Sequence, residues 1–327
     1  MRILVSGGQG FLGGALTRAL VERGGHEVIA TARRPAPDLE ALGVTVARVD
    51  LRDREAVLPL GEGVDLIFHT AAKAGIWGAY SDYHDANVVA TENLLASARQ
   101  NTVRYFVHTS SPSVTFSGHS EVDIDETTPY SRAPLNPYCM TKILSEKAVL
   151  AAHGDGALQT LALRPHLIYG PGDPHLLPRV FEAAASRSGL IRVGDGLNRV
   201  DVTHIADTVA AHLAALDRRE DAEIWGRPYF ITSGQPVLLW DWLEQVLAWK
   251  GLPGVRLSLG LRKAVLLGTG LQWLYRLLRL SGEPRLTRFS ALQLGCSHTY
   301  SIEQARQRLG YTPVVDPYSP FEQQFQH

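Results

Sequence analysis

The sequence predicts an α/β fold in which a doubly wound parallel sheet is joined to a smaller, partly helical C-terminal lobe. Three observations predict it. In the first half of the chain, short apolar runs alternate with helical patterns, as they do in βαβ units. A glycine-rich loop separates the first apolar run from the first helical pattern. After about residue 170 the alternation weakens and Gly and Pro become more frequent, which indicates a less regular second part.

The individual elements follow from this alternation. Apolar runs rich in Val, Ile, Leu and Phe are typical of buried parallel strands. Six strands are expected, over residues 2–7, 26–32, 44–50, 64–71, 103–111 and 158–165. Apolar residues at helical spacing connect them and predict helices over 11–23, 54–60, 83–100 and 137–153.

The expected domain organisation follows from the position of the strands. Ligands of doubly wound sheets bind at the carboxyl ends of the strands. Residues 1–170 are therefore expected to form a Rossmann-type dinucleotide-binding domain. Residues 171–327 are expected to form mainly a substrate-binding lobe, with 200–216 returning to the first domain.

Composition and charge exclude several classes of protein. The 327 residues include 32 Lys and Arg against 33 Asp and Glu, so a basic surface for nucleic acid is not expected. The twelve histidines show no metal-ligand spacing, so no metal site is expected. Cys139 and Cys296 are expected to be free thiols, and no leader pattern precedes the first strand. The expected location is the cytoplasm.

The glycine-rich loop is the first candidate binding site. In "GGQGFLGG", glycines stand at 7, 8, 10, 13 and 14, after a strand and at the start of a helix. Backbone N–H groups at such a helix N-terminus, including those of Phe11 and Leu12, can bind a pyrophosphate. The spacing fits two registers, beginning at Gly7 or at Gly8, and the loop alone does not choose between them.

The end of the second strand predicts which nicotinamide cofactor binds. An acidic residue there would accept hydrogen bonds from the ribose of NAD, but the sequence has Ala32 followed by Arg33 and Arg34. A guanidinium can bind a 2′-phosphate through two hydrogen bonds at once (bidentate binding), so NADP(H) is the expected cofactor. The alternative is that both arginines are solvated in a turn.

Residues at the next two strand ends are expected to complete the cofactor site. Asp50 is a candidate for binding the adenine amino group, with Leu51 packed on the ring. Ala71 and Ala72 would let the backbone approach the cofactor closely. His69, in the same strand, is expected to be structural.

The motif "NPYCMTK" predicts the catalytic residues. Tyr138 and Lys142 are four residues apart and therefore share one helix face. A nearby ammonium is expected to lower the pKa of the phenol, which would let it exchange a proton with a substrate oxygen. Ser111 is preferred as the hydroxyl that binds the same oxygen, with Ser110 and Ser113 as alternatives.

A fourth catalytic candidate lies in the helix expected over 83–100. Asn87 is expected to bind backbone or water and to complete a proton relay from Lys142. A structural role for this buried polar side chain is the alternative, and the two roles are compatible.

These motifs together resemble the extended short-chain dehydrogenases/reductases. The resemblance covers nearly the whole chain and rests on "SGGQGFLG", "HTAA", "NVVATENLL", "TSS", "PYCMTK" and "LRPHLIYGPGD". It implies the register of Gly7, Gly10 and Gly13, and a catalytic set of Ser111, Tyr138, Lys142 and Asn87. It also implies that Pro165, His166 and Leu167 lie at the nicotinamide end and that the protein forms a homodimer.

A narrower resemblance is to the 3β-hydroxysteroid dehydrogenase-like branch, and within it to bacterial reductases of 2-alkyl-3-oxoalkanoates. It rests on "AAKAGIWGAYSDYHDANVVATENLL" and on the apolar C-terminal stretch. It implies NADPH-dependent reduction of the 3-keto group of a long-chain substrate in olefin biosynthesis. The alternatives are a sterol-type dehydrogenase, a sugar-nucleotide epimerase or dehydratase, and a non-catalytic NADP(H)-binding sensor or scaffold.

Residues expected to contact a substrate are less sharply defined. Two alkyl tails need a long apolar surface, which Trp77 and Tyr80 could extend. A substrate carboxylate needs a donor, for which Lys73, His119 and Arg199 are candidates.

Residues 257–280 form an apolar stretch that four basic residues interrupt. Its longest uncharged run is shorter than the ~20 residues of a membrane span. Amphipathic helices packed on the core are one interpretation. The alternative is a lid over an apolar substrate, or a face that contacts a membrane surface or a pathway enzyme.

Overall fold

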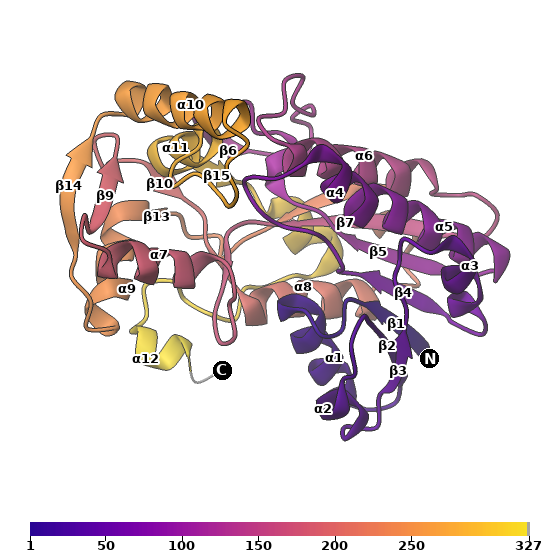
Figure 1. The fold of residues 1–327 in the computed structure, drawn as a ribbon. Coiled ribbons are helices and arrows are strands. Elements are labelled where there is room, and N and C mark those ends of the chain that lie inside the picture. The colour runs from indigo at the N-terminus through magenta and orange to yellow at the C-terminus, as the bar shows by residue number, and fades with distance from the viewer. Residues whose placement is uncertain (326–327) are drawn as a thin grey trace.

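Seven parallel strands form the central sheet of the protein, whose computed structural model describes residues 1–325 (Figure 1). The strand order is β12-β7-β5-β4-β1-β2-β3. The bounds are β1 Arg2–Ser6, β2 Glu27–Ala32, β3 Thr45–Arg48, β4 Leu66–His69, β5 Tyr105–Thr109, β7 Gln159–Pro165 and β12 Pro228–Ile231. The six strands predicted from the sequence are all present, and the predicted α/β fold class is confirmed.

Helices cover both faces of this sheet. On one face, α1 (Phe11–Arg23) and α8 (Ile205–Asp217) bury apolar side chains such as Leu16, Leu20 and Leu216 against the strands. On the other face, α5 (Ala90–Gln100) and α6 (Pro137–Ala151) do the same with Leu94 and Val149. The sheet is therefore doubly wound (Figure 1).

Two of the predicted helices are divided in the structure. Residues 54–60 become α3 (Arg54–Val57) followed by a 3₁₀ turn over Leu58–Gly61, where Pro59 ends the regular helix. Residues 80–100 contain α4 (Tyr80–Tyr83), a π-helical turn over His84–Val89, and α5. The single helix predicted over 83–100 is therefore interrupted by a π-helical turn.

The C-terminal lobe is built from short strands and helices around its own core. One sheet has the order β13-β10-β15-β6, and two strand pairs, β11-β8 and β14-β9, lie beside it. The strands are β6 Glu121–Ile124, β8 Ile168–Tyr169, β9 Leu190–Val193, β10 Arg199–Val200, β11 Thr203–His204, β13 Val237–Leu238, β14 Val255–Leu259 and β15 His298–Tyr300. The helices are α7 Leu176–Ala185, α9 Leu239–Trp249, α10 Leu261–Leu277, α11 Arg288–Gly295 and α12 Phe321–Gln324. Short helical turns lie in both halves of the chain. They are α2 Pro37–Glu40, the 3₁₀ turns Pro112–Val114 and Ala222–Ile224, and a π-helical turn Ala305–Leu309.

Segments of the second half return to the nucleotide-binding half. Helix α8, within the expected 200–216 segment and just beyond it, packs against α1, and Asp217 pairs with Arg23. Two further segments of the second half that pack on the nucleotide-binding half were not predicted from the sequence. Strand β12 pairs with β7, and Leu309 and Tyr311 enter the core under α8. The two halves are therefore joined by buried contacts from several parts of the chain.

The interpretation of residues 257–280 as amphipathic helices packed on the core is correct only in part, because one side of α10 packs on the lobe through Leu261, Ala264 and Val265. Residues 257–259 belong to strand β14, which pairs with β9. In α10, Ala264 and Gly268 are buried, whereas several Leu side chains and Trp273 face solvent. Periodicity shows that a helix has two faces, but it does not show which face the fold covers.

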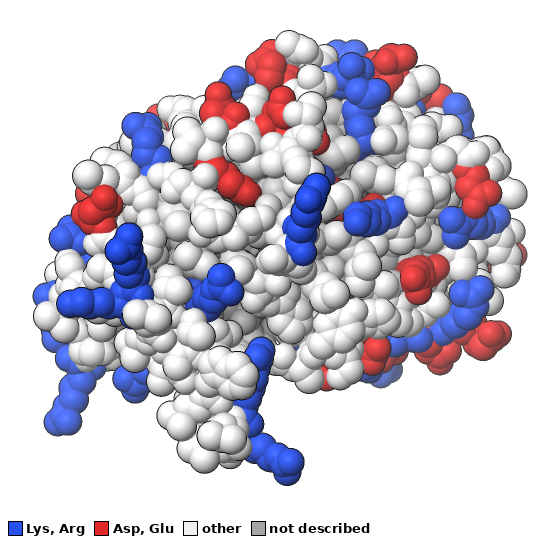
Figure 2. All heavy atoms as spheres, turned by 90° about the horizontal axis from the view of Figure 1, so that it is seen from above, with Lys and Arg blue, Asp and Glu red and all other residues white. Residues whose placement is uncertain are grey.

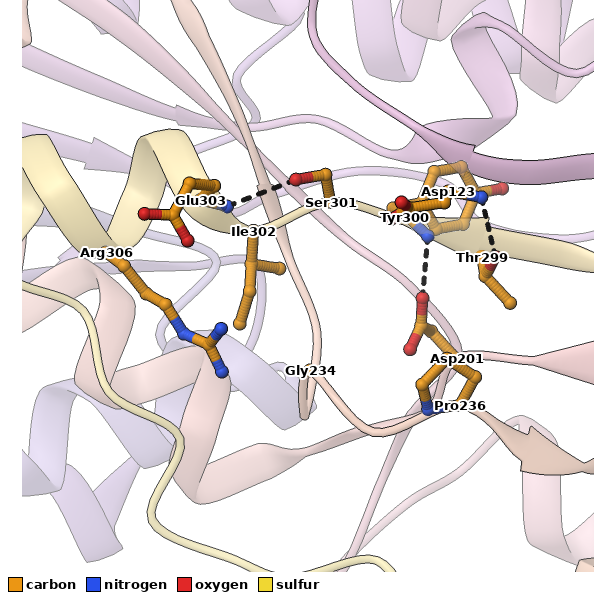
Figure 3. Close-up of a pocket in the computed structure, with 10 residues that line it drawn as sticks. All are labelled: Asp123, Asp201, Gly234, Pro236, Thr299, Tyr300, Ser301, Ile302, Glu303 and Arg306. Atoms are coloured by element: carbon orange, nitrogen blue, oxygen red, sulfur yellow. Dashed lines mark hydrogen bonds between the residues drawn. The ribbon is translucent and has the colours of Figure 1, made fainter.

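A buried carboxylate joins β10 to β15 in the lobe. Asp201 accepts a hydrogen bond from the Tyr300 amide at 2.7 Å and is fully buried. Asp201 borders a hollow of about 140 Å³, which Asp123 and Pro236 also line (Figure 3). Burial raises the pKa of Asp201 from 3.8 to about 7.

We expect this carboxyl to make stability depend on pH. Its pKa is higher in the folded than in the unfolded chain, so its favourable contribution is complete below about pH 4 and is lost by about pH 7. Asp201→Asn keeps an acceptor for Tyr300 but cannot ionise. Its Tm should exceed that of the parent at pH 8, by about 3 °C or more, and the difference should shrink toward pH 5. Thermal unfolding across this range measures it.

The matched control is Asp38→Asn, which makes the same change at an exposed carboxylate. A Tm difference between Asp201→Asn and the parent that stays constant from pH 5 to 8 contradicts the prediction.

Candidate active site

The glycine-rich loop lies between β1 and α1 and is held by backbone contacts. The Gly7 amide donates to Thr31 Oγ1 at 3.0 Å, and the Gly10 amide donates to the Gly7 carbonyl at 2.8 Å. Gly7 has φ +72°, a conformation that favours glycine. Gly10 is the N-cap of α1, so the amides of Phe11 and Leu12 have no partner within the helix. They are free to bind an anion at the positive end of the helix dipole.

Steric contacts show why two of these positions are glycine. A Cβ at Gly13 would lie 2.2 Å from the Gly7 carbonyl oxygen, so the helix and the loop touch there. A Cβ at Gly8 would lie 2.6 Å from Ala30 Cβ on β2. The sequence gives no reason to treat Gly8 as essential, because the register of Gly7, Gly10 and Gly13 omits it. The structure requires it for packing.

A hollow of about 340 Å³ opens beyond this loop. It is lined by Arg33, Arg48, Val49 and Asp50, which lie at the ends of β2 and β3. Arg33 is exposed, as is Arg34. Sequence reasoning missed Arg48, whose place in the last position of β3 could be recognised only after the strand register was known. The lining therefore includes two guanidinium groups, which are able to bind a phosphate.

Asp50 contributes the negative group of this hollow. Its carboxylate accepts bonds from the Arg52 side chain, the shortest at 2.5 Å, and from the Arg52 amide at 3.0 Å. These hydrogen bonds lower the pKa of Asp50 to about 2, and nearby Arg33 adds to the effect. Asp50 therefore stays an acceptor at neutral pH. Leu51 is half-buried beside it. The glycine loop, the hollow and this acceptor together fit a dinucleotide.

The segment after β4 passes directly against the glycine loop. A Cβ at Gly7 would lie 3.0 Å from Ala71 Cα, so the two backbones pass too close for a side chain at position 7. The Ala71 amide donates to Ser6 Oγ at 3.1 Å, and Ala72 is exposed. Both alanines thus lie beside the phosphate-binding amides.

His69 lies in the core and links β1 to the π-helical turn. Its Nδ1 contacts Ser6 Oγ at 2.8 Å and its Nε2 contacts Thr91 Oγ1 at 2.9 Å. Since Ser6 Oγ already accepts two amide bonds, its hydrogen goes to His69 Nδ1, and His69 Nε2 donates to Thr91. Burial lowers the pKa of His69 to about 3, so the ring stays neutral. This agrees with the structural role expected for it.

Asn87 is buried in the π-helical turn, where it holds the loop that follows β4. Its Oδ1 accepts from the Lys73 amide at 2.7 Å, and its Nδ2 donates to the Lys73 carbonyl at 3.2 Å and to Thr141 Oγ1 at 2.9 Å. The extra residue of a π turn displaces a backbone carbonyl from the helical ladder. The Asn87 carbonyl accepts instead from Thr91 Oγ1 and Ser145 Oγ. Asn87 thus connects α6 to the loop, and its role in a proton relay stays a prediction.

Tyr138 and Lys142 lie on the first turns of α6, which begins after Asn136. The Asn136 side chain caps the helix by accepting from the Cys139 amide at 2.8 Å, and Pro137 occupies the first helical position. Lys142 is buried, and its Nζ donates to the Thr109 carbonyl at 2.6 Å. Burial lowers the pKa of Lys142 to about 8.

The pKa of Tyr138 differs from the expectation. Burial raises it to about 12, and a hydrogen bond from Ser111 opposes this rise only in part. The expected lowering by Lys142 is wrong for the protein alone, because the ammonium is directed to the Thr109 carbonyl. At neutral pH the phenol therefore carries its proton, as a proton donor must.

The three candidate serines have different surroundings. Ser111 lies against Tyr138, and its Oγ accepts from the Ser113 amide at 3.2 Å. Ser110 faces the other way and donates to Glu146 Oε2. Ser113 is buried beside Cys139. Alternation along the end of β5 explains why only one of the neighbouring pair Ser110 and Ser111 reaches the tyrosine.

The segment after β7 lies at the end of the sheet, where the nicotinamide end was expected. Pro165 is buried and Leu167 has φ +43°, a strained value for a residue with a branched side chain. His166 Nε2 contacts His298 Nδ1 at 2.8 Å, and His298 Nε2 contacts the Gln293 carbonyl at 2.8 Å. Since a carbonyl only accepts, His298 donates to Gln293 and His166 donates to His298.

Sequence reasoning missed the ion pair beneath the catalytic helix. Glu146 and Arg164 are buried and meet through Nη2 and Oε1 at 2.5 Å, with Arg164 Nε also donating. Ser110 and Tyr130 donate to the same carboxylate. Glu146 is four residues after Lys142 and therefore lies on the same helix face. A second charged residue on this predicted inward face could have indicated a buried ion pair.

The proposed substrate-contacting residues are scattered, and two are engaged elsewhere. Lys73 pairs with Asp82 at 2.9 Å, and Arg199 donates to the Pro236 carbonyl at 3.0 Å. His119 and Tyr80 are exposed. Trp77 packs edge-on against Tyr275 of α10, with ring centroids 6.3 Å apart.

Comparisons with known proteins agree with this geometry. The profile of the NAD dependent epimerase/dehydratase family matches residues 3–227. The chain is 46% identical to a 2-alkyl-3-oxoalkanoate reductase of Stenotrophomonas maltophilia (strain K279a), over 96% of both chains. It is 32% identical to a 3-beta-hydroxysteroid dehydrogenase of Mycolicibacterium neoaurum, over 96% of this chain and 87% of that protein.

Among solved structures, a UDP-glucuronic acid 4-epimerase from Bacillus cereus, in complex with UDP-glucuronic acid and NAD, has the same fold. Its TM-score is 0.75 at 22% identity, over 100% of this chain and 98% of that one. At this identity the likeness concerns the fold alone.

We expect the Glu146–Arg164 pair to be required for stability. Glu146→Gln removes the only carboxylate that the structure shows hydrogen-bonded to the buried Arg164 within residues 1–325 and leaves Glu126 as a weaker counter-charge, so the free energy of unfolding should fall by about 3 kcal/mol or more. Urea unfolding measures it. The control Glu220→Gln breaks the exposed Arg104–Glu220 pair and should cost less than about 1 kcal/mol. Equal losses in the two variants would refute the prediction.

Proposed function

Because the chain belongs to the NAD dependent epimerase/dehydratase family, we propose that it uses NADPH to reduce the 3-keto group of a long-chain 2-alkyl-3-oxoalkanoate to the 2-alkyl-3-hydroxyalkanoate. The match with the extended short-chain dehydrogenases/reductases and their 3β-hydroxysteroid dehydrogenase-like branch is confirmed, and the chain is an oxidoreductase. Relatives named 2-alkyl-3-oxoalkanoate reductase support a ketoreductase role. A non-catalytic sensor or scaffold is therefore set aside.

The observation that carries the proposal is a protonated Tyr138 beside Ser111. Bound NADPH supplies a hydride from its nicotinamide ring to the carbonyl carbon. Ser111 donates a hydrogen bond to the carbonyl oxygen, and Tyr138 gives its proton to that oxygen as negative charge develops there. The buried ammonium of Lys142 donates to the Thr109 carbonyl in the protein alone, so it would stabilise the resulting phenolate by turning toward it.

Residues of the glycine loop and the hollow would hold the cofactor. The amides at the start of α1 would bind the pyrophosphate, and Asp50 would accept from the adenine amino group. Arg33, with Arg34 behind it, would bind the 2′-phosphate. The absence of a carboxylate at Ala32 supports NADP(H) over NAD(H).

A sterol-type dehydrogenase is the second candidate, because a relative with a hydroxysteroid dehydrogenase name is 32% identical to this chain. Olefin biosynthesis and a homodimer are part of the first proposal and follow from the family resemblance. A cytoplasmic location is proposed from the two cysteines, which are free in the structure. A sugar-nucleotide epimerase is less well supported, since the solved epimerase shares only the fold.

We expect Tyr138→Phe to abolish carbonyl reduction while the protein still binds NADPH. Loss of the proton donor should lower kcat about 10²- to 10⁴-fold. Turnover is measured as NADPH oxidation with 2-alkyl-3-keto acids, 3-ketosteroids and UDP-sugars. Tyr318→Phe, at an exposed tyrosine outside the site, is the control and should keep parental activity. Near-parental turnover of Tyr138→Phe, or turnover of UDP-sugars alone by the parent, would defeat the proposal.

Arg33→Ser tests cofactor choice separately. Removing a charged hydrogen bond to the 2′-phosphate should raise the KM for NADPH about 10- to 100-fold, while the KM for NADH changes little. Arg218→Ser, at another exposed arginine, is the control for loss of charge. An unchanged ratio of kcat/KM for the two cofactors in Arg33→Ser would show that this arginine does not select NADP(H).

A further inference from the structure

Helix α10 presents an apolar face to solvent. Leu266, Trp273 and Leu277 have exposed fractions of 73%, 68% and 78%. Leu267 and Leu274 on the same helix are also exposed, and Leu278 and Leu280 follow it. Single exposed apolar side chains are common, but a contiguous group of this size marks an interaction surface.

The spacing of these residues places them on one side of α10. Residues 266, 270, 273 and 277 follow one another at intervals of three or four, so they line a single stripe along the helix. The opposite side carries the buried residues Ala264 and Gly268. A Cβ at Gly268 would lie 2.7 Å from the Thr287 backbone, which shows how closely this side packs on the lobe. The fold therefore fixes the apolar stripe outward.

Basic residues surround this stripe. Arg262 and Lys263 lie at the start of α10, and Arg276 and Arg279 at its end, all exposed. From residue 245 to 282 the chain has six Lys or Arg and no Asp or Glu. Figure 2, which looks down on the side that carries α10, shows blue side chains standing around broad white areas at the lower left. The chain as a whole has a net charge of −1, so this positive charge is local.

We propose that α10 docks the protein on an anionic membrane surface. The Leu and Trp side chains of the stripe would enter the boundary between headgroups and acyl chains, with the helix axis parallel to the surface. The arginines and Lys263 would reach the lipid phosphates. Residues 1–325 contain no helix long and apolar enough to cross a bilayer, so this contact is with the surface.

The local charge favours a membrane over a second copy of the chain. Two copies facing each other through this stripe would bring two positive borders together, which opposes association. An anionic lipid surface complements both the apolar stripe and its border. The inference does not depend on the proposed substrate, because it rests only on the exposed side chains and the charge around them.

Helix α10 also touches the loop that crosses the candidate active site. The Arg276 guanidinium lies over the Trp77 ring at 5.3 Å, and the Trp77 carbonyl accepts from Tyr83 at 3.0 Å. The same loop is held by Asn87 at Lys73. If the proposed function is correct, a substrate with long alkyl tails could pass from the bilayer to this loop without crossing water.

Vesicle sedimentation with the full chain tests the inference. The parent should bind vesicles of phosphatidylcholine and phosphatidylglycerol more strongly than vesicles of phosphatidylcholine alone, and added salt should weaken the binding. Leu277→Asp and Arg262→Glu should each reduce it about tenfold or more. Leu42→Asp, at an exposed leucine in the nucleotide-binding half, is the control and should bind like the parent. Thermal unfolding checks that each variant is folded.

Two results would overturn the inference. One is equal binding of the parent and Leu277→Asp to anionic vesicles. The other is a parent that does not bind vesicles but changes from dimer to monomer in light scattering when Leu277 is replaced by Asp, which would assign the stripe to a second copy. Neither result involves turnover, so failure here is distinguishable from failure of the proposed reaction.

Discussion

The buried contact between Glu146 and Arg164 fixes the position on which the candidate active site depends. It joins α6, which carries Tyr138 and Lys142, to strand β7 of the central sheet. Ser110 at the end of β5 donates to the same carboxylate, so its neighbour Ser111 must face the other way, toward Tyr138. One ion pair thus sets the helix, the strand end and the orientation of the serine. An apolar pair of equal volume could hold the helix but could not orient Ser110.

A second set of buried hydrogen bonds connects the phosphate-binding end of the site to the catalytic end. It runs from Ser6 beside the glycine loop through His69 and Thr91 to the carbonyl of Asn87. Every donor in this series of hydrogen bonds meets one acceptor, and the ring of His69 stays neutral because burial lowers its pKa to about 3. To bind a dinucleotide in the correct position, the phosphate-binding end and the catalytic end of the site must be fixed relative to each other. These hydrogen bonds fix them through the buried core.

The sequence predicted those parts of the structure that local patterns determine. The six strands and helix α1 were found because apolar runs and the glycine loop are contiguous signals. Tyr138, Lys142 and Ser111 were proposed because their arrangement matches a known motif, and the structure brings Ser111 against Tyr138. Strand β12 was missed because "PYFI" lies outside the regular alternation of the first half, and its burial comes from pairing with the distant β7. Arg48 and the protonated state of Tyr138 depend on the strand register and on burial, and neither is encoded within a short window.

Helix α10 shows the limit of pattern reasoning most directly. Its apolar residues repeat as they would on a helix packed against a core, yet the fold packs only the side with Leu261 and Ala264 inward and leaves a second apolar stripe in solvent. At Gly268 the Thr287 backbone approaches the inward side closely, so the lobe has no room for a side chain at this position. Because folding does not remove this apolar stripe from water, the stripe contributes no hydrophobic free energy to the stability of the protein. The basic residues that border the stripe are the reason for assigning it to an anionic surface.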